Sequence, residues 1–333
     1  MYKGGARMKK KGIALVERQY LFPFVLITSL FFLWGFAHAI LDVLNKHFQE
    51  LLTITRTHSA MIQATMYMGY FIMAIPAGLF INRHGYRKGV VLGLLLYGIG
   101  SLLFIPGQYI ASFNMFLFSL FVIGCGLTFL ETAANPYVTE LGARETAASR
   151  LNFAQSFNGL GCIFAPILTG LLLFSDEDKG ASGNVALPYA VMGVIVLLAA
   201  LAFMRVRLPE IPHEEEVDSE GHRVGLWAHK LFVFGLVALF AYEVSEISIN
   251  SFFINYVTEV GWMNARDASL VLSFGGLGLF MVGRFVGSWI MRRVRAEKML
   301  FWCATGTVIT TLLVILDLGS VSFVDLLCGY AFE

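Results

Sequence analysis

Nine long apolar stretches constrain the fold of this chain more than any other feature of its sequence. They cover roughly residues 21–46, 59–81, 89–108, 115–139, 149–174, 187–206, 228–256, 268–290 and 298–317, and a tenth begins near Ser320. A helix of about 20 apolar residues crosses the hydrocarbon core of a bilayer, which is about 30 Å thick. The sequence therefore predicts an all-α polytopic membrane protein with nine full spans and part of a tenth.

The composition excludes other broad classes of protein. Apolar residues make up 57% of the chain and charged residues only 14%, whereas a soluble domain carries about 25% charged residues. The net charge of +1 leaves no basic excess for binding a nucleic acid. The four cysteines lie in apolar stretches without metal-like spacing, so we interpret them as small core residues: Cys125, Cys162, Cys303 and Cys328.

The distribution of Lys and Arg residues predicts how the helices are oriented. With the N-terminus in the cytoplasm, 19 of the 24 lie on the cytoplasmic side and four on the opposite side, while Arg284 lies inside a span. Cytoplasmic loops usually carry such an excess of basic residues. We therefore expect residues 1–20 to form a cytoplasmic tail, and the first helix to remain in the mature protein because no cleavage site follows it.

A polar, acidic segment at residues 207–227 separates two groups of apolar stretches. We expect it to be a cytoplasmic loop between a six-helix bundle at residues 21–206 and an incomplete second bundle at residues 228–333, which holds helices 7–9 and the start of helix 10. A shift of 209 residues lays Gly78 on Gly287, as expected for two parallel halves. Two such halves would end near residue 440, so we expect that roughly 100 residues of the second bundle are absent.

Glu131 is the most informative polar residue inside an apolar stretch. It lies about 16 residues into its span and has no basic residue within a helical turn. A carboxylate at membrane depth is costly, so we expect a functional role. Asn135 and Pro136 follow it, and the proline removes a backbone donor, which predicts that the helix kinks or opens there.

The first span carries a polar stripe on one helical face, formed by Trp34, His38, Asp42 and Asn45. Asp42 is a functional candidate for the same reason as Glu131. His38 is open to two interpretations, a satisfied core histidine or a pocket group, and its pairing with Asp42 lacks a third ligand, so we expect no metal site. The flat indole of Trp34 can stack on the C–H face of a pyranose while carboxylates and amides bind its hydroxyls.

Two further spans carry polar residues near one face: Asn152, Gln155 and Asn158 in the fifth, and Glu243, Glu246, Asn250 and Asn255 in the seventh. For Asn152 and Asn255, hydrogen bonding between helices explains the residue at least as well as ligand contact. Arg284 lies about two turns from the cytoplasmic end, where a long side chain can snorkel to the interface. Its structural and functional interpretations are equally good.

Three segments carry a resemblance to a known family. FFLWGFAHAILDVLNKHFQELL (31–52), FLETAANPYVTELG (129–142) and RLNFAQSFNGLG (150–161) resemble the fucose–galactose–gluconate:proton symporter family of the major facilitator superfamily. The resemblance continues more loosely through residues 241–257 and 283–293. The loop GLFINRHGYRKG (78–89) is similar to the signature loop of the superfamily, with Asn82 where an acid is usual.

The resemblance implies proton-driven uptake of a monosaccharide across a bacterial inner membrane, by alternating access of two bundles around a central site. It implies a monomer with no cofactor besides the proton as coupling ion. L-fucose is the first substrate we expect, and glucose or galactose is the alternative. The proton-coupling acids of the family match Glu131 and Asp42. The expected substrate-binding residues are Trp34, His38, Asp42, Glu131, Asn135, Gln155, Asn158 and Glu246.

Two other classes of function fit less well. A membrane sugar sensor would ordinarily add a signalling domain, and neither the 20-residue tail nor the central loop is long enough to fold as one. An intramembrane enzyme would need a catalytic motif, and the chain contains no HExxH, no nucleophile elbow and no paired Gly-Asp motif. We therefore expect a transporter and not an enzyme.

Overall fold

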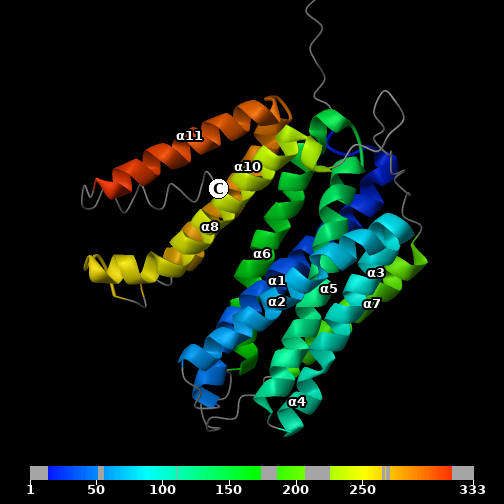
Figure 1. Cartoon of the computed structure of the whole chain (residues 1–333), viewed down its shortest axis with the longest axis vertical. Coiled ribbons are helices and arrows are strands. Elements are labelled where there is room, and N and C mark those ends of the chain that lie inside the picture. Colours follow the sequence, from blue (N-terminus) through cyan, green and yellow to red (C-terminus); the bar gives the residue numbers. More distant parts are fainter. Residues whose placement is uncertain are drawn as a thin grey trace, which may run out of the picture. The chain divides into compact units, whose positions relative to one another are not determined.

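The computed structural model describes residues 14–51, 56–110, 112–173, 186–206, 226–264, 267 and 271–316, and every regular element within these ranges is helical. The described α-helices are α1 (Leu21–Leu51), α2 (Arg56–His84), α3 (Tyr86–Leu102), α4 (Phe104–Ile110), α5 (Phe113–Glu140), α6 (Ala147–Leu173), α7 (Ala186–Arg205), α8 (Lys230–Glu259), α10 (Leu277–Met291) and α11 (Ala296–Ile315) (Figure 1). A π-helical turn, Val271–Gly276, leads into α10.

The all-helical membrane fold predicted from the sequence is confirmed in these residues. Seven helical segments of the described chain are long and apolar enough to cross a membrane: Arg18–Leu41, Met61–His84, Tyr86–Ile110, Phe113–Glu140, Ala186–Arg205, Phe274–Met291 and Ala296–Ile315. Helices α6 and α8 lie at the two other predicted spans. The count of nine spans and the orientation stay predictions, and the tenth apolar run lies outside the described residues.

Backbone contacts divide the chain into two compact units. The first comprises Met1–Ile211 and Met281–Gly306, and the second comprises Pro212–Phe280 and Thr307–Glu333. The predicted boundary loop at residues 207–227 contains the break between Ile211 and Pro212. The predicted bundles themselves stay predictions.

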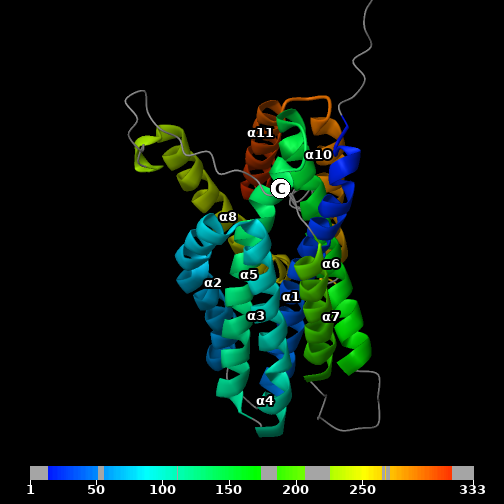
Figure 2. The ribbon, with the colours of Figure 1, turned by 90° about the vertical axis from the view of Figure 1, so that its right-hand side faces the viewer.

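In the first unit, α1 packs along α6, α2 along α5, and α3 along both α5 and α7 (Figures 1 and 2). The core between these helices consists of buried apolar side chains, among them Ile27, Leu94, Leu127 and Val196. At one end, the rings of Phe104 in α4 and Tyr189 in α7 stack with their centroids 3.6 Å apart. This packing brings α2 together with α1, α5 and α6, the helices that carry Trp34, Glu131 and Gln155.

Glycines allow two of these helix pairs to touch through their backbones. A Cβ atom on Gly69 of α2 would lie 2.7 Å from the carbonyl oxygen of Phe121, and one on Gly124 of α5 would lie 2.3 Å from that of Met66. The α1–α6 pair meets in the same way at Gly35 and Gly161. Small residues at such crossings are typical of helix pairs in membranes, because they permit close approach of the backbones.

Arg150 is fully buried at the start of α6. Its guanidinium donates to backbone carbonyls of Val138 and Thr139 at the end of α5, to that of Ala143 in the loop, and to that of Leu15 before α1. It also donates to the hydroxyl of Thr146 at 2.5 Å. One side chain thus joins three segments of the first unit.

The part of α10 that belongs to the first unit is hydrogen-bonded to α6. Ser149 Oγ donates to the carbonyl of Ser288 at 2.5 Å, and Ser288 Oγ donates to the carbonyl of Ser149 at 2.8 Å. Asn152 Nδ2 donates to the carbonyl of Arg284 at 2.9 Å, which confirms the helix–helix interpretation of Asn152.

The second unit contains α8 and the turn that ends it. Gly261 has a φ of 80°, a left-handed conformation that favours glycine. The turn brings Trp262 edge-on to Tyr256, with ring centroids 5.6 Å apart. The carboxamide oxygen of Asn264 then accepts from the backbone N–H of Asp267 at 2.9 Å.

Candidate functional site

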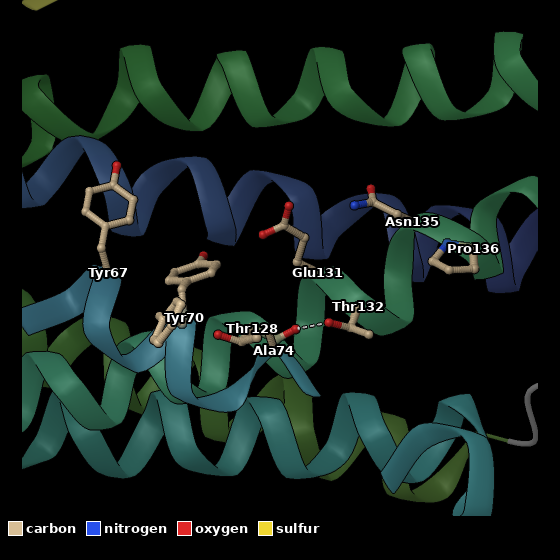
Figure 3. A pocket seen from close by; sticks show the side chains of 9 residues that line it. Tyr67, Tyr70, Ala74, Thr128, Glu131, Thr132, Asn135 and Pro136 are labelled. Carbon is tan, nitrogen blue, oxygen red and sulfur yellow. Dashed lines mark hydrogen bonds between the residues drawn. The ribbon is translucent and has the colours of Figure 1, made fainter. Parts of the chain in front are cut away.

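A cavity of about 670 Å³ lies between α2 and α5 of the first unit (Figure 3). Helix α2 contributes Tyr67, Tyr70, Phe71 and Ala74 to its lining, and α5 contributes Thr128, Glu131, Thr132, Asn135 and Pro136. Small-molecule sites in proteins have volumes of about 300–1,000 Å³ and combine apolar walls with a few polar groups. The cavity therefore has the size and the lining of a ligand site.

The α2 wall is aromatic because of the helical spacing of its residues. Tyr67, Tyr70, Phe71 and Ala74 stand at i, i+3, i+4 and i+7, which is one face of a helix. Sequence reasoning missed these residues. Their spacing can be read from the sequence, but the chain has 12 Tyr and 30 Phe residues, and nothing distinguishes these four positions from the other apolar ones.

The α5 wall is polar, and the sequence predicted its two most polar members. Thr128 Oγ1 donates to the carbonyl of Gly124 at 2.8 Å, and Thr132 Oγ1 donates to that of Thr128 at 2.7 Å (Figure 3). These hydroxyl hydrogens are thus used within the helix. The carboxyl group of Glu131 and the amide of Asn135 carry the polar character of this wall.

The sequence predicted that the helix kinks or opens at Pro136, and it does not open, because α5 runs as one helix from Phe113 to Glu140 with the proline inside it. The kink stays a prediction. Pro136 can donate no hydrogen bond to the carbonyl of Thr132, four residues earlier. The helix continues because α2, α3 and α6 pack along it and hold the backbone in place. Pro136 itself forms part of the cavity lining.

Gln155 of α6 is hydrogen-bonded to Asn135, a residue of the cavity lining. Its Nε2 donates to Asn135 Oδ1 at 3.2 Å, which leaves the two Nδ2 hydrogens of Asn135 as donors. The other predicted amide of α6, Asn158, lies at the α1–α6 crossing, where its backbone oxygen faces Gly35 and its Oδ1 lies 3.9 Å from the thiol of Cys162. Asn158 is not among the residues that line the cavity.

Trp34 and His38 of α1 contact tyrosines of the cavity wall. Trp34 Nε1 donates to the hydroxyl of Tyr70 at 2.9 Å. The ring of His38 lies 5.9 Å from those of Trp34 and Tyr70 and 6.4 Å from that of Tyr67, between centroids. His38 Nδ1 lies 3.2 Å from the carbonyl of Trp34, which can only accept, so Nδ1 carries a proton. Neither residue is among those that line the cavity.

The remaining predicted residues are not placed at this cavity. Asp42 lies in α1, but its side chain is outside the described residues, as are those of Asn45, Asn250 and Asn255. Glu246 is partly buried in α8 of the second unit. Among the described residues, no three His, Cys, Asp or Glu side chains gather as a metal site would require.

Sequence comparison places the chain among known proteins. Residues 24–332 match the family model of the Major Facilitator Superfamily. A glucose/galactose transporter of Brucella abortus biovar 1 (strain 9-941) is 34% identical over 312 residues, covering 92% of this chain and 76% of that protein. An L-fucose-proton symporter of Escherichia coli (strain K12) is 34% identical over 309 residues, covering 85% of this chain and 70% of that protein.

Comparison with solved structures agrees with the sequence comparison. The crystal structure of the transporter FucP in the outward conformation superposes with a TM-score of 0.79 at 32% identity, covering 95% of this chain and 82% of that one. A proton:xylose symporter, XylE, superposes with a TM-score of 0.67 at 14% identity, a level at which the likeness concerns the fold alone.

Proposed function

Since the chain belongs to the major facilitator superfamily, in the family of the fucose and glucose/galactose symporters, we propose that it carries a monosaccharide across a bacterial inner membrane together with a proton. It is a transporter and not an enzyme. L-fucose is the first substrate to test. Glucose or galactose is the second, because relatives named for either activity are equally similar to this chain.

The observation that carries this proposal is the pairing of Glu131 with an aromatic wall in one cavity. An aromatic ring packs well against the C–H face of a sugar, and a carboxylate and an amide can bind its hydroxyls. Tyr67, Tyr70 and Phe71 provide the first kind of contact, and Glu131 and Asn135 provide the second. The same division of roles was expected from the sequence, with Trp34 as the aromatic partner.

Glu131 is also the proposed proton-coupling group. Removal from water disfavours the ionised carboxylate, so a carboxyl group in such a site can take up a proton on one side of the membrane and release it on the other. One proton that moves inward down 100 mV releases about 2.3 kcal/mol, which corresponds to roughly a fifty-fold sugar gradient. In this proposal Asp42 binds sugar hydroxyls and shares the proton.

Uptake into proteoliposomes tests both parts of the proposal. A competition panel of L-fucose, D-galactose and D-glucose identifies the substrate, and recovery of the sugar unchanged separates a transporter from a sensor or an enzyme. Glu131→Gln should retain sugar counterflow and lose accumulation driven by a proton gradient. Glu140→Gln, at the exposed end of the same helix, is the matched control and should retain both. Proton-driven accumulation by Glu131→Gln would overturn the assignment.

A further inference from the structure

Tyr70 connects the cavity to α1 through one hydrogen bond. Its ring lines the cavity, and its hydroxyl accepts from Trp34 Nε1, at a distance of 2.9 Å between residues that lie 36 positions apart in the sequence. We infer that Tyr70 hydrogen-bonds the transported sugar, and that Trp34 is a positioning residue that acts through Tyr70. This inference rests on the proposed function and adds a specificity-determining residue to it.

The direction of the Trp34–Tyr70 bond determines what the phenol can offer to a ligand. An indole N–H can only donate, so the Tyr70 oxygen is the acceptor. A phenol has one hydrogen of its own, and the indole N–H offers no lone pair to accept it. The hydrogen of Tyr70 is therefore directed to a partner other than Trp34, and Figure 3 shows this side chain turned toward the same cavity as Glu131.

The surroundings of Tyr70 hold the phenol in place before any ligand arrives. Its ring lies 5.9 Å from that of His38 and 6.2 Å from that of Tyr67, between centroids, and it packs against the apolar core of the unit. His38 is held in turn by its contact with the carbonyl of Trp34. A donor that is already oriented loses little conformational entropy when the ligand binds.

Tyr70 and Glu131 are complementary in hydrogen bonding. An ionised carboxylate can only accept, the phenol of Tyr70 has a hydrogen to donate, and a sugar hydroxyl can do both. The charge of Glu131 also acts electrostatically on Tyr70. A sugar hydroxyl between the two can donate to Glu131 and accept from Tyr70, which makes Tyr70 sensitive to the position and configuration of that hydroxyl.

The role of Trp34 follows from its hydrogen bond to Tyr70. Its N–H donates to the hydroxyl of Tyr70, and its ring lies 5.9 Å from that of His38, between centroids. Trp34 is not among the residues that line the cavity. Replacing the indole with a phenyl ring removes the donor and keeps an aromatic side chain. Its effect on transport should then be exerted through the orientation of the Tyr70 hydroxyl.

A double-mutant cycle in proteoliposomes tests whether Trp34 acts on the sugar through Tyr70. Tyr70→Phe removes the hydroxyl, Trp34→Phe removes the N–H, and both keep an aromatic ring. Loss of one hydrogen bond corresponds to about a three- to ten-fold rise in the KM for sugar counterflow, with an unchanged maximal rate. The double variant should have the KM of Tyr70→Phe alone. In a Tyr67→Phe background, which keeps the Trp34–Tyr70 bond, Trp34→Phe should retain its full effect.

A panel of monodeoxy analogues of the transported sugar measures how strongly the protein discriminates between sugars. If Tyr70 had a purely structural role, this discrimination would not change at one position only. The wild-type protein should discriminate against the analogue that lacks the hydroxyl bound by Tyr70, and Tyr70→Phe should lose that discrimination at this position only. An unchanged KM in Tyr70→Phe, additive effects in the double variant, or equal discrimination in both proteins would overturn the inference. The absence of uptake of any sugar by the wild-type protein would instead refute the proposed function.

Discussion

Two charged residues of the first unit, Glu131 and Arg150, lie in different kinds of surroundings. Glu131 faces a cavity, where a ligand can reach its carboxyl group. The guanidinium of Arg150 is fully buried and bonds to four backbone carbonyls and one hydroxyl of its own unit. The first arrangement is suited to binding and the second to holding chain segments together.

Arg150→Lys should destabilise the first unit, although the charge is kept. A lysine ammonium lacks the planar fork that reaches several acceptors at once, so some of these carbonyls would lose their donor. Hydrogen bonds to charged groups are each worth about 1.5–3 kcal/mol, and we expect a loss of about 2 kcal/mol or more in the free energy of unfolding. The midpoint of thermal unfolding in detergent measures it.

Arg144→Lys is the matched control, because Arg144 is an exposed residue in the same loop region. Its unfolding midpoint should equal that of the unmodified protein. Equal midpoints for the two lysine variants would contradict the role assigned to Arg150.

At the scale of helices, the crossing of α2 and α5 creates the cavity. Gly69 and Gly124 allow the two backbones to touch, and Tyr70 and Glu131 follow on the same two helices within about two turns of that contact. Larger residues at either glycine would separate the helices and move the aromatic wall away from the carboxyl group.

Gly124→Ala should therefore impair both stability and sugar binding. The new methyl group would lie 2.3 Å from the carbonyl oxygen of Met66, so one of the helices has to shift. Overpacking of this kind costs about 1–3 kcal/mol. We expect a lower unfolding midpoint in detergent and about a ten-fold or greater loss of sugar affinity in equilibrium binding.

Gly78→Ala is the control for this prediction, since a Cβ atom on Gly78 of α2 would meet nothing within 4 Å. Alanine favours the helix over glycine by about 1 kcal/mol, so this variant should be neutral or slightly more stable. A similar loss of affinity in both alanine variants would show that the crossing is not what positions the site.

At the scale of the whole molecule, the proposed transport by alternating access would have to break contacts between helices once in every cycle. The reciprocal hydrogen bonds between Ser149 of α6 and Ser288 of α10 join two halves of the predicted repeat. Under the proposed function, this contact must open when the binding site changes sides. A covalent link at this point should therefore arrest transport without removing sugar binding.

The paired variant Ser149→Cys, Ser288→Cys tests this expectation. Oxidation should form a disulfide, abolish at least nine-tenths of the sugar uptake, and leave equilibrium binding in detergent unchanged, and a reducing agent should restore uptake. Each single cysteine variant, oxidised in the same way, should keep transporting. Undiminished uptake by the fully cross-linked protein would show that the α6–α10 contact need not open.

The sequence by itself determined the class of the protein, the approximate positions of most of the helices that the structure describes, and the candidates Glu131 and Asn135 of α5. These depend on local properties: the length of an apolar stretch decides whether a helix can span a membrane, and a carboxylate such as Glu131 stands out because its burial is costly. The segments resembling the symporter family led to the family that the comparisons established. The spacing of four residues between Trp34 and His38 also placed them on one face of α1.

Only the tertiary structure decided which helix faces that carboxylate and what surrounds Trp34. The aromatic wall of α2, the bond from Trp34 to Tyr70 and the burial of Arg150 all join residues that are distant in the sequence or in different elements. Their positions depend on which helices touch, and this depends on the fit of backbone against backbone at residues such as Gly69 and Gly124. Complementarity between two surfaces is a property of the folded pair, so neither helix encodes it alone.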